Sequence, residues 1–339
     1  MTKAMKRTFA AALVIVLCIS GCDAFSKRQF SVTYLDLFDT VTTITAAVSS
    51  QQDFQTQAQQ IYKQLQQYHR LFDIYQEYPG INNLKTVNDN AGIAPVEVDE
   101  KIISFLKDCR DYYDLTQGAM HVAMGSVLQL WHQCRQSALE DPKLAALPQM
   151  AALQEALQHI DMNDLVLDEE KSTVYLADKA MALDVGAVAK GWAARQVAED
   201  LPEGFLLSIG GSIYATGPKG ENTPWIIGIE DPDGGAYLHK LSLTEGGVAT
   251  SGDYQRYFTV DGVNYHHIID PQTAVPTALW RSVSVVCPDP GLADVLSTAL
   301  FVLPLEEGKE LAAKAQAEAM WLDHTGQRYY TEGFENYIA

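Results

Sequence analysis

The sequence predicts an α+β fold, a single large domain with a mixed, largely antiparallel sheet packed by helices. Short runs rich in β-branched residues recur along the chain, and amphipathic patterns at helical spacing lie between them. An Asp-Gly pair at 261–262 separates two strand patterns, as in a β-hairpin. With 339 residues, of which 47% are hydrophobic, the chain is long enough to bury a substantial core.

The first 22 residues have the pattern of an export signal. Three cations precede an apolar run over 9–19, which is too short to span a bilayer and is typical of a signal-peptide core. The next residues, Ile-Ser-Gly-Cys, resemble a bacterial lipobox and predict lipidation of Cys22 at the extracytoplasmic face of the cell membrane. A plain secretory signal with a chance cysteine is the alternative. The expected signal peptide, lipidated N-terminus with linker, and domain are 1–21, 22–32 and 33–339.

The chain is acidic, and this excludes some partners. It carries 24 Lys and Arg against 43 Asp and Glu, a formal net charge of −19. Removal of 1–21 takes away three cations and no acid, so the rest has 21 against 43 and a charge of −22. Such a surface repels phosphate backbones, so we expect no nucleic-acid partner. A phosphate-bearing substrate then requires a metal ion or a local basic group.

The remaining cysteines do not indicate a disulfide framework or a zinc site. If Cys22 is lipidated, Cys109, Cys134 and Cys287 are left, an odd number without paired Cys-x-x-Cys spacing. We therefore expect buried free thiols.

The N-terminal half predicts a strand and two amphipathic helices. The run over 34–48 is rich in β-branched residues and predicts one strand. Ser50 predicts a helix cap, and apolar residues recur at helical spacing as far as Phe72. Asp99 predicts the cap of a second helix with an apolar face. The stretch between these helices, 78–92, has the composition of a loop.

The second half alternates strands and helices. An alanine- and glutamine-rich stretch with two prolines, 132–160, predicts a surface insertion of short helices. Helical patterns follow Lys190 and Pro290. Five runs predict strands: 164–176, 180–185, 205–210, 225–230 and 282–287.

The Asp-Gly turn sets the relation between two adjacent histidines. Counting outward from the turn pairs Tyr257 with His266. Successive residues of a strand point to opposite faces, so His266 and His267 should lie on opposite faces. We therefore expect at most one of them to face a given pocket.

A nearly all-apolar helix over 289–304 contains one carboxylate. The pattern predicts burial on almost all sides, so Asp294 must be paired, bound to a metal, or protonated. Ser297 and Thr298 follow three and four residues later and can direct hydroxyls to the same point. Oxygen ligands of this kind favour Mg²⁺ or Ca²⁺ over zinc. The alternative is that Asp294 is a local cap near the helix start.

Three glycine-dense turns accompany the strands, over 182–201, 208–217 and 246–258. The first leads into a helix whose N-terminus could approach an anion, with Lys190 as a point charge, or it is a plain strand-to-helix turn. Neither a P-loop nor a dinucleotide-binding fingerprint occurs in the chain.

Five stretches, in this order and spacing, resemble the ApbE family of flavin transferases: DVGAVAKGWA, SIGGSIYATG, TSGDYQRYF, HHIIDPQT and LADVLSTALFVL. The resemblance covers 33–305 and implies an ApbE-like fold. It also implies Mg²⁺-dependent transfer of FMN from FAD to a Ser or Thr hydroxyl of an exported acceptor protein, with release of AMP.

The resemblance implies roles for individual residues. The family's Mg²⁺ ligands match the carbonyl of Ala187, the carboxylate of Asp294 and the hydroxyl of Thr298. The family histidine before Ile-Ile-Asp-Pro matches His267, which makes it the expected catalytic base, while His266 replaces a serine. Positions of the FAD site match Phe38, Asn83, Ala119, Met120, His121, Asp184, Lys190, Gly211, Ser251 and Ile269.

The chain also departs from the family pattern, at Phe38-Asp39 in place of Met-Gly, Asn82-Asn83 in place of serines, Met120-His121 in place of an apolar-Asp pair, and Ala274 in place of glycine.

Two other functions stay open. Water could replace the acceptor hydroxyl, which would give a Mg²⁺-dependent FAD pyrophosphatase that yields FMN and AMP. The chain could also be an FAD-binding lipoprotein without catalysis.

Overall fold

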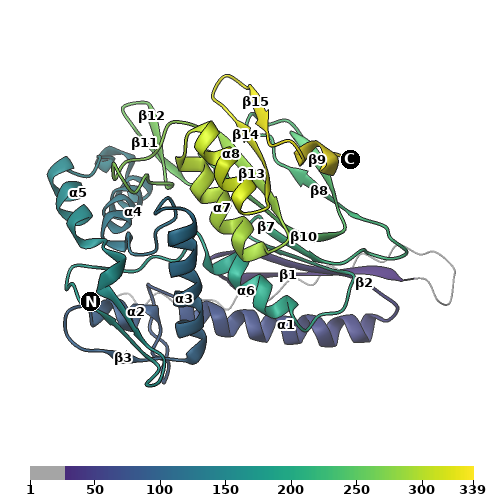
Figure 1. Ribbon diagram of the computed structural model, residues 1–339, viewed down its shortest axis with the longest axis horizontal. Helices are drawn as coiled ribbons and strands as arrows, with labels where there is room; N and C mark the ends of the chain where they lie inside the picture. The colour runs from purple at the N-terminus through teal and green to yellow at the C-terminus, as the bar shows by residue number, and fades with distance from the viewer. Residues whose placement is uncertain (1–26) are drawn as a thin grey trace.

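The computed structural model describes residues 27–339 and is built around one eight-stranded sheet (Figure 1). The predicted α+β class is confirmed, but the sheet is antiparallel at every described pairing and is not mixed. In spatial order the strands are β1 (Arg28–Leu37), β2 (Thr40–Val48), β6 (Phe205–Ile209), β7 (Ser212–Thr216), β10 (Glu245–Gly252), β13 (Ser282–Cys287), β14 (Glu318–Leu322) and β15 (Arg328–Tyr330).

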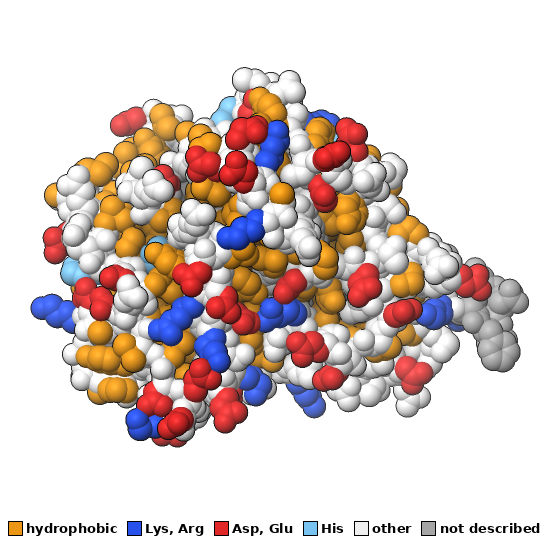
Figure 2. Space-filling model, viewed as in Figure 1, with side chains coloured by type: hydrophobic (Ala, Val, Ile, Leu, Met, Phe, Trp, Pro, Cys, Tyr) orange, Lys and Arg blue, Asp and Glu red, His pale blue; other side chains and the backbone are white. Residues whose placement is uncertain are grey.

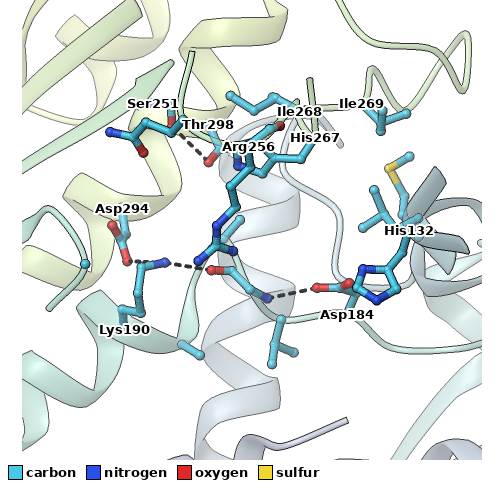
Figure 3. Close-up of a pocket in the computed structure, with 18 of the residues that line it drawn as sticks. His132, Asp184, Lys190, Ser251, Arg256, His267, Ile268, Ile269, Asp294 and Thr298 are labelled. Carbon is cyan, nitrogen blue, oxygen red and sulfur yellow. Dashed lines mark hydrogen bonds and ion pairs between the residues drawn. The ribbon is translucent and has the colours of Figure 1, made fainter. Parts of the chain in front are cut away.

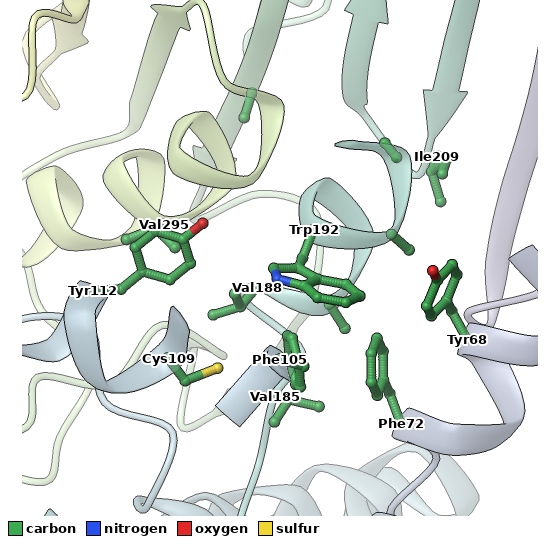
Figure 4. Close-up of a cluster of buried hydrophobic side chains, with 14 of the residues drawn as sticks. Tyr68, Phe72, Phe105, Cys109, Tyr112, Val185, Val188, Trp192, Ile209 and Val295 are labelled. Carbon is green, nitrogen blue, oxygen red and sulfur yellow. The ribbon is translucent and has the colours of Figure 1, made fainter. Parts of the chain in front are cut away.

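Helices cover one face of the sheet: α1 (Gln51–Phe72), α6 (Ala189–Ala198), α7 (Pro290–Val302) and α8 (Leu305–Lys314). Trp192 of α6 is the centre of their core, and the rings of Tyr68, Phe72 and Phe105 lie edge-on to it with centroids 5.2 to 5.5 Å away (Figure 4). Edge-to-face aromatic packing of this kind stabilises a core beyond its buried area. The cluster therefore joins α1, α3 (Glu100–Leu115) and α6 into one unit.

A small second sheet covers the opposite face. It consists of β8 (Trp225–Ile229) and β9 (His239–Leu243), which form a core with Val248 and Met320 of the large sheet. The 3-10 helix η4 (Phe334–Tyr337) closes this layer. The main body therefore has three layers, with helices, the large sheet and a two-stranded sheet.

The rest of the chain packs beside this body. Its elements are α2 (Leu84–Asp89), β3 (Val96–Glu97), α4 (Gly125–Glu140), η1 (Pro142–Leu144), α5 (Met150–Ala156), η2 (Leu157–His159), η3 (Met162–Asp164), β4 (Leu165–Asp168), β5 (Thr173–Leu176), β11 (Tyr257–Val260) and β12 (Val263–His266). Trp131 of α4 stacks on Tyr265 of the β11–β12 hairpin. The hairpin is thus held against α4 and not against the large sheet.

Several predicted caps and registers are confirmed. The Ser50 side chain accepts a hydrogen bond from the Asp53 amide at 3.3 Å, and the Asp99 side chain accepts one from the Lys101 amide at 2.9 Å. Such caps satisfy backbone donors that the first helical turn leaves unpaired. In the β11–β12 hairpin, Tyr257 lies opposite His266 as counted from the turn.

Four predicted boundaries were wrong. The run over 34–48 is not one strand, because the chain reverses at Phe38-Asp39 between β1 and β2. β1 begins at Arg28, inside the stretch predicted as a linker. The predicted loop 78–92 contains α2, and 180–185 forms only one isolated bridge, through Ala182. The apolar residues of 180–185 pack into the core without strand pairing, so composition alone misled the prediction.

The three described cysteines form no disulfide bond, and the described helices include no candidate membrane span. Cys109, Cys134 and Cys287 are free, and the first and third are buried as predicted, whereas Cys134 is half-buried. Within residues 27–339 no helix has both the length and the apolar character needed to cross a bilayer. The predicted signal peptide and Cys22 lie outside the described residues.

Close packing of α6 against α7 depends on a glycine. A Cβ at Gly191 would lie 2.4 Å from the Pro290 carbonyl oxygen and 2.9 Å from the Asp294 Cβ. Both distances are too short for non-bonded atoms, so only a residue without a side chain allows the two helices to approach this closely.

We predict that Gly191→Ala lowers the free energy of unfolding by about 2 kcal/mol, because the added methyl group forces α6 and α7 apart. Urea unfolding followed by circular dichroism measures the change. Gly186→Ala is the control, since its added Cβ meets only the Asp184 carboxylate, at 3.3 Å. Equal stability of Gly191→Ala and the unchanged protein would contradict the close packing.

Candidate active site

A cavity of about 350 Å³ opens where the main body meets the surrounding elements. The β1–β2 turn, the end of α1, α4, the β10 end and α7 all contribute to its wall, so residues far apart in the sequence meet there. Most of the predicted site residues line it: Phe38, Ala119, Met120, His121, Asp184, Ala187, Lys190, Ser251, His267, Ile269, Asp294 and Thr298. Figure 3 labels seven of these, among them Asp184, His267 and Asp294.

Two predicted cofactor-site residues do not line the cavity. Asn83 is fully buried and caps α2, with its side-chain oxygen accepting from the Thr86 amide and its amide nitrogen donating to the carbonyls of Arg70 and Gln76. All its hydrogen-bonding groups are therefore used in folding. Gly211 lies at the β6–β7 turn, but its neighbour Gly210 is the one that borders the cavity.

Asp294 is buried on α7 and is held by the start of α6. One carboxylate oxygen accepts the Gly191 amide hydrogen at 2.8 Å, and the other accepts the Ser212 hydroxyl. The Lys190 ammonium lies 3.8 Å from the first oxygen (Figure 3). The cap of α7 is Asp289, so the interpretation of Asp294 as a local cap was wrong.

The hydrogen bond from Gly191 has a second effect, on the carbonyl of Ala187. In a regular helix the Gly191 amide would donate to this carbonyl four residues earlier, but it donates to Asp294 instead. Among the described residues no amide donates to the Ala187 carbonyl. It borders the cavity as a free acceptor, together with the Asp294 carboxylate and the Thr298 hydroxyl.

These three groups fit a hard divalent cation. They are all oxygen donors and only one is charged, which suits Mg²⁺ completed by oxygens of an anionic ligand. Within residues 27–339 there is no cluster of three His, Cys, Asp or Glu side chains, so no softer metal site competes. The ammonium group of the neighbouring Lys190 also partly neutralises the negative charge of the Asp294 carboxylate.

The two adjacent histidines both border the cavity, but their hydrogen bonds differ. His266 is buried, its Nδ1 accepts from the Ile268 amide at 3.2 Å, and its Nε2 donates to the Thr277 carbonyl at 2.7 Å. Both ring nitrogens are thus occupied. The expectation that only one histidine could face the pocket was wrong, because the chain leaves the strand at His266.

His267 is exposed and borders the cavity, and its Nε2 has no hydrogen-bond partner among the described residues. Its Nδ1 lies 3.3 Å from the Arg256 carbonyl oxygen. A carbonyl can only accept, so Nδ1 carries the hydrogen and Nε2 keeps its lone pair. Surrounding protein atoms, with Arg256, lower the pKa of His267 to about 3. Water in the open cavity offsets part of this desolvation, and the ring is neutral at neutral pH.

Sequence reasoning missed a group of cations in this wall. Arg135 and Arg256 line the cavity near Lys190, and no ion pair of either arginine with a carboxylate is present over 27–339. Burial and the nearby Arg256 lower the pKa of Arg135. On the face shown in Figure 2, carboxylates and cations are interspersed. Unpaired cations in a protein of negative charge indicate an anionic ligand. Arg256 lies in a stretch that the family resemblance had quoted, but Arg135 carried no signal.

Aromatic and strained residues form other parts of the wall. Phe38 and Asp39 have φ angles of 52° and 50°, and Tyr75 stacks on His132 with ring centroids 5.4 Å apart. A bulky residue with positive φ costs about 1 kcal/mol or more and is held by its surroundings. Ala274 also has a positive φ, of 58°, but it is buried and does not line the cavity.

Asp270 has a structural role in the turn that follows the cavity wall. Its carboxylate accepts hydrogen bonds from the Gln272 amide at 2.8 Å and the Thr273 hydroxyl at 3.0 Å. It therefore shapes the turn that follows Ile269.

The chain is similar to known proteins over most of its length. The sequence model of the ApbE family matches residues 38–321. An FAD:protein FMN transferase of Treponema pallidum is 36% identical over 244 residues, which cover 66% of each chain. One of Haemophilus influenzae is 31% identical over 264 residues, 75% of each chain. The crystal structure of the ApbE protein from Thermotoga maritima has a TM-score of 0.80 at 30% identity and covers 92% of this chain and 99% of its own.

We predict that His121 makes the protein less stable in acid. Burial lowers the pKa of His121 to about 4, below the ~6.5 of an unfolded histidine. Between these values the unfolded chain binds the proton and the folded one does not, so stability falls as the pH falls from ~6.5 toward 4.

Urea unfolding at pH 7 and pH 5 tests this. His121→Asn should reduce the difference in unfolding free energy between the two pH values by about 1 kcal/mol. His159 is a control of opposite sign, because Asp178 raises its pKa, so His159→Gln should increase the difference. An unchanged difference in His121→Asn would disprove the assignment.

Proposed function

This chain belongs to the ApbE family, and from that premise we propose that it is an FAD:protein FMN transferase acting on a Ser or Thr of an exported acceptor protein. The observation that carries the proposal is the free Nε2 of His267, which borders the same cavity as the three oxygen donors on Ala187, Asp294 and Thr298. A base and a cation site beside unpaired basic side chains suit transfer of a phosphoryl group.

In the proposed reaction the acceptor hydroxyl attacks the phosphorus on the FMN side of FAD. A bond forms between this oxygen and phosphorus, the phosphorus–oxygen bond to AMP breaks, and AMP leaves with the electron pair. The hydroxyl proton passes to Nε2 of His267, which is neutral and can accept it. The Arg256 carbonyl fixes the ring through Nδ1 and so directs Nε2 to the acceptor.

Charge neutralisation comes from the other side chains of the wall. Lys190, Arg135 and Arg256 supply positive charge for the pyrophosphate of FAD, which the acidic surface would otherwise repel. We propose that Ala187, Asp294 and Thr298 hold Mg²⁺, which supplies further positive charge to the pyrophosphate when bound. Burial keeps the Asp294 carboxylate in one orientation through Gly191 and Ser212.

FAD hydrolysis is a second candidate function, because His267 is an exposed residue that water can reach. Water in place of the acceptor hydroxyl would give FMN and AMP. Incubation with FAD and Mg²⁺ but no acceptor separates the two, since only a pyrophosphatase then releases AMP over many turnovers. Retention of FAD without AMP release, whichever acceptor is added, would instead indicate an FAD-binding protein without catalysis.

We predict that His267→Ala lowers the rate of FMN transfer at least about 100-fold but leaves FAD binding largely intact, because only the proton acceptor is lost. FMN incorporated into an acceptor is measured by mass, and FAD binding by titration calorimetry. His266→Ala is the matched control. Both ring nitrogens of His266 form hydrogen bonds within the protein, so the substitution should reduce thermal stability more than it reduces the rate of FMN transfer. A full rate in His267→Ala, with loss of rate in His266→Ala, would reverse the assignment.

We predict that Asp294→Asn abolishes the dependence of FMN transfer on Mg²⁺ and reduces the rate at least about 100-fold at saturating FAD. The asparagine preserves the shape of the side chain but removes the only charged ligand. Calorimetric titration of Mg²⁺ in the presence of FAD should show no binding at micromolar protein. The same Mg²⁺ affinity in variant and unchanged protein would exclude Asp294 as a ligand.

We also propose that Cys22 is lipidated and holds the enzyme at the extracytoplasmic membrane face, because residues 19–22 resemble a lipobox. Cys22→Ser should move the protein from the membrane fraction to the soluble fraction without changing its intrinsic rate. Membrane association of Cys22→Ser equal to that of the unchanged protein would contradict the anchor.

A further inference from the structure

We infer that His69 is a positioning residue for FAD, which holds the strained Phe38–Asp39 turn in the cavity wall. This inference rests on the proposed function, since it requires the cavity to bind FAD. His69 lies on α1 and borders the cavity with both residues of the turn. It touches no reacting group, so its role is to fix the shape of the site.

The turn needs an external restraint. Phe38 and Asp39 both have positive φ, a conformation that glycine adopts freely and that other residues disfavour. Two-residue hairpin turns of this kind normally contain asparagine or glycine. The sequence of this turn therefore does not account for its conformation.

His69 provides the restraint through a directed chain of hydrogen bonds. The Phe38 amide donates to Nδ1 of His69 at 3.1 Å. The hydroxyl of Tyr78 donates its one hydrogen to the Asp73 carboxylate at 2.8 Å, so its oxygen accepts from Nε2 of His69 at 3.3 Å. Only one neutral tautomer of His69, with the hydrogen on Nε2, satisfies both neighbours.

The same chain reaches a second part of the wall. The other oxygen of the Asp73 carboxylate accepts the amides of Tyr75 at 2.7 Å and Gln76 at 2.9 Å. Tyr75 stacks on His132 of α4 and borders the cavity. One network at the end of α1 thus sets the backbone of both Phe38 and Tyr75, which are aromatic wall residues.

The surroundings keep the donors and acceptors in these roles. Burial, followed by the hydrogen bond to Asp73, raises the pKa of Tyr78, so its hydroxyl retains its hydrogen at neutral pH. The charged groups near this pair are Asp73, Asp39 and the Arg70 guanidinium, which lies 5.8 Å from the centre of the Tyr78 ring. The Phe38 ring lies edge-on to His69 with centroids 5.7 Å apart and adds an apolar contact.

A residue in this role should affect the binding of FAD and not the chemical step. Loss of the acceptor at Nδ1 leaves the Phe38 amide unpaired and lets the turn relax away from positive φ. The planar rings of FAD would then meet a displaced wall. Because His267 and the oxygen donors are untouched, the rate at saturating FAD should remain.

The test compares two substitutions of His69 that keep different nitrogens. The side-chain oxygen of His69→Asn can take the place of Nδ1, whereas the side chain of His69→Gln extends toward the place of Nε2. His239→Gln is a matched control, since His239 also bonds a tyrosine hydroxyl, that of Tyr330 at 2.8 Å, but does not border the cavity. Titration of FAD against tryptophan fluorescence gives Kd, because Trp131 lines the cavity.

We expect His69→Gln to raise Kd and KM for FAD about tenfold with kcat within about twofold, and His69→Asn to restore most of the affinity. His239→Gln should bind FAD as the unchanged protein does. Equal loss of affinity in both His69 variants, or a loss of kcat with unchanged Kd, would overturn the inference. If the unchanged protein itself binds no FAD, the proposed function fails, and the inference with it.

A second variant tests the strain directly and does not depend on the fit of an asparagine. Asp39→Gly introduces a residue that adopts positive φ at no cost, so in the His69→Gln background it should recover at least about half of the lost affinity on a logarithmic scale. Thermal melting verifies that every variant is folded. Purely additive effects of the two substitutions would show that His69 does not act through the turn.

Discussion

The hydrogen bond from the Gly191 amide to the Asp294 carboxylate is the contact on which the site depends. It exists because glycine lets α6 approach α7, and because the first turn of a helix has amides without partners in the helix. The bond stabilises a carboxylate that would otherwise be expensive to bury. It also leaves the Ala187 carbonyl free. One contact therefore both fixes the charged oxygen ligand and exposes a neutral one at the same cavity wall.

The second constraint is charge. A chain with a formal charge of −19 brings Lys190, Arg135 and Arg256 to one cavity, and over residues 27–339 neither arginine is paired with a carboxylate. By contrast, the guanidinium group of Arg195 lies between Asp108 and Asp289 and is neutralised by structural ion pairs. The protein thus separates cations that hold its helices together from cations that face a ligand. This separation makes recognition of a pyrophosphate compatible with an acidic surface.

Histidine illustrates how hydrogen bonding decides a role. His266 and His267 are neighbours and both border the cavity, yet the first has two backbone partners and the second has one. His69 resembles His266, since both its nitrogens are occupied, and it acts on the shape of the site. Only the nitrogen without a protein partner is available to accept a proton from a substrate. All three residues are histidines, and their roles differ because different hydrogen-bond partners surround their rings.

The sequence by itself determined the fold class, the helix caps at Ser50 and Asp99, the β11–β12 register and the burial of Asp294. Each follows from local rules, such as period-two alternation, capping chemistry or an uninterrupted apolar pattern, which act over a few residues. The family resemblance then indicated most of the residues that border the cavity. Asn83 and Gly211 were exceptions, because the Asn83 side chain is used to cap α2 and the backbone of the β6–β7 turn brings Gly210 to the cavity instead of Gly211.

Only the tertiary structure decided the rest. The free Ala187 carbonyl, the tautomer of His267, the cation at Arg135 and the restraint of Phe38 by His69 each depend on atoms that are distant in the sequence. These hydrogen bonds and contacts form when α1, α4, α6 and α7 pack together. No pattern within a single segment of the sequence encodes them. The sequence therefore indicated which groups are present, and the packing set which of their lone pairs and hydrogens remain free, because that depends on neighbours supplied by other elements.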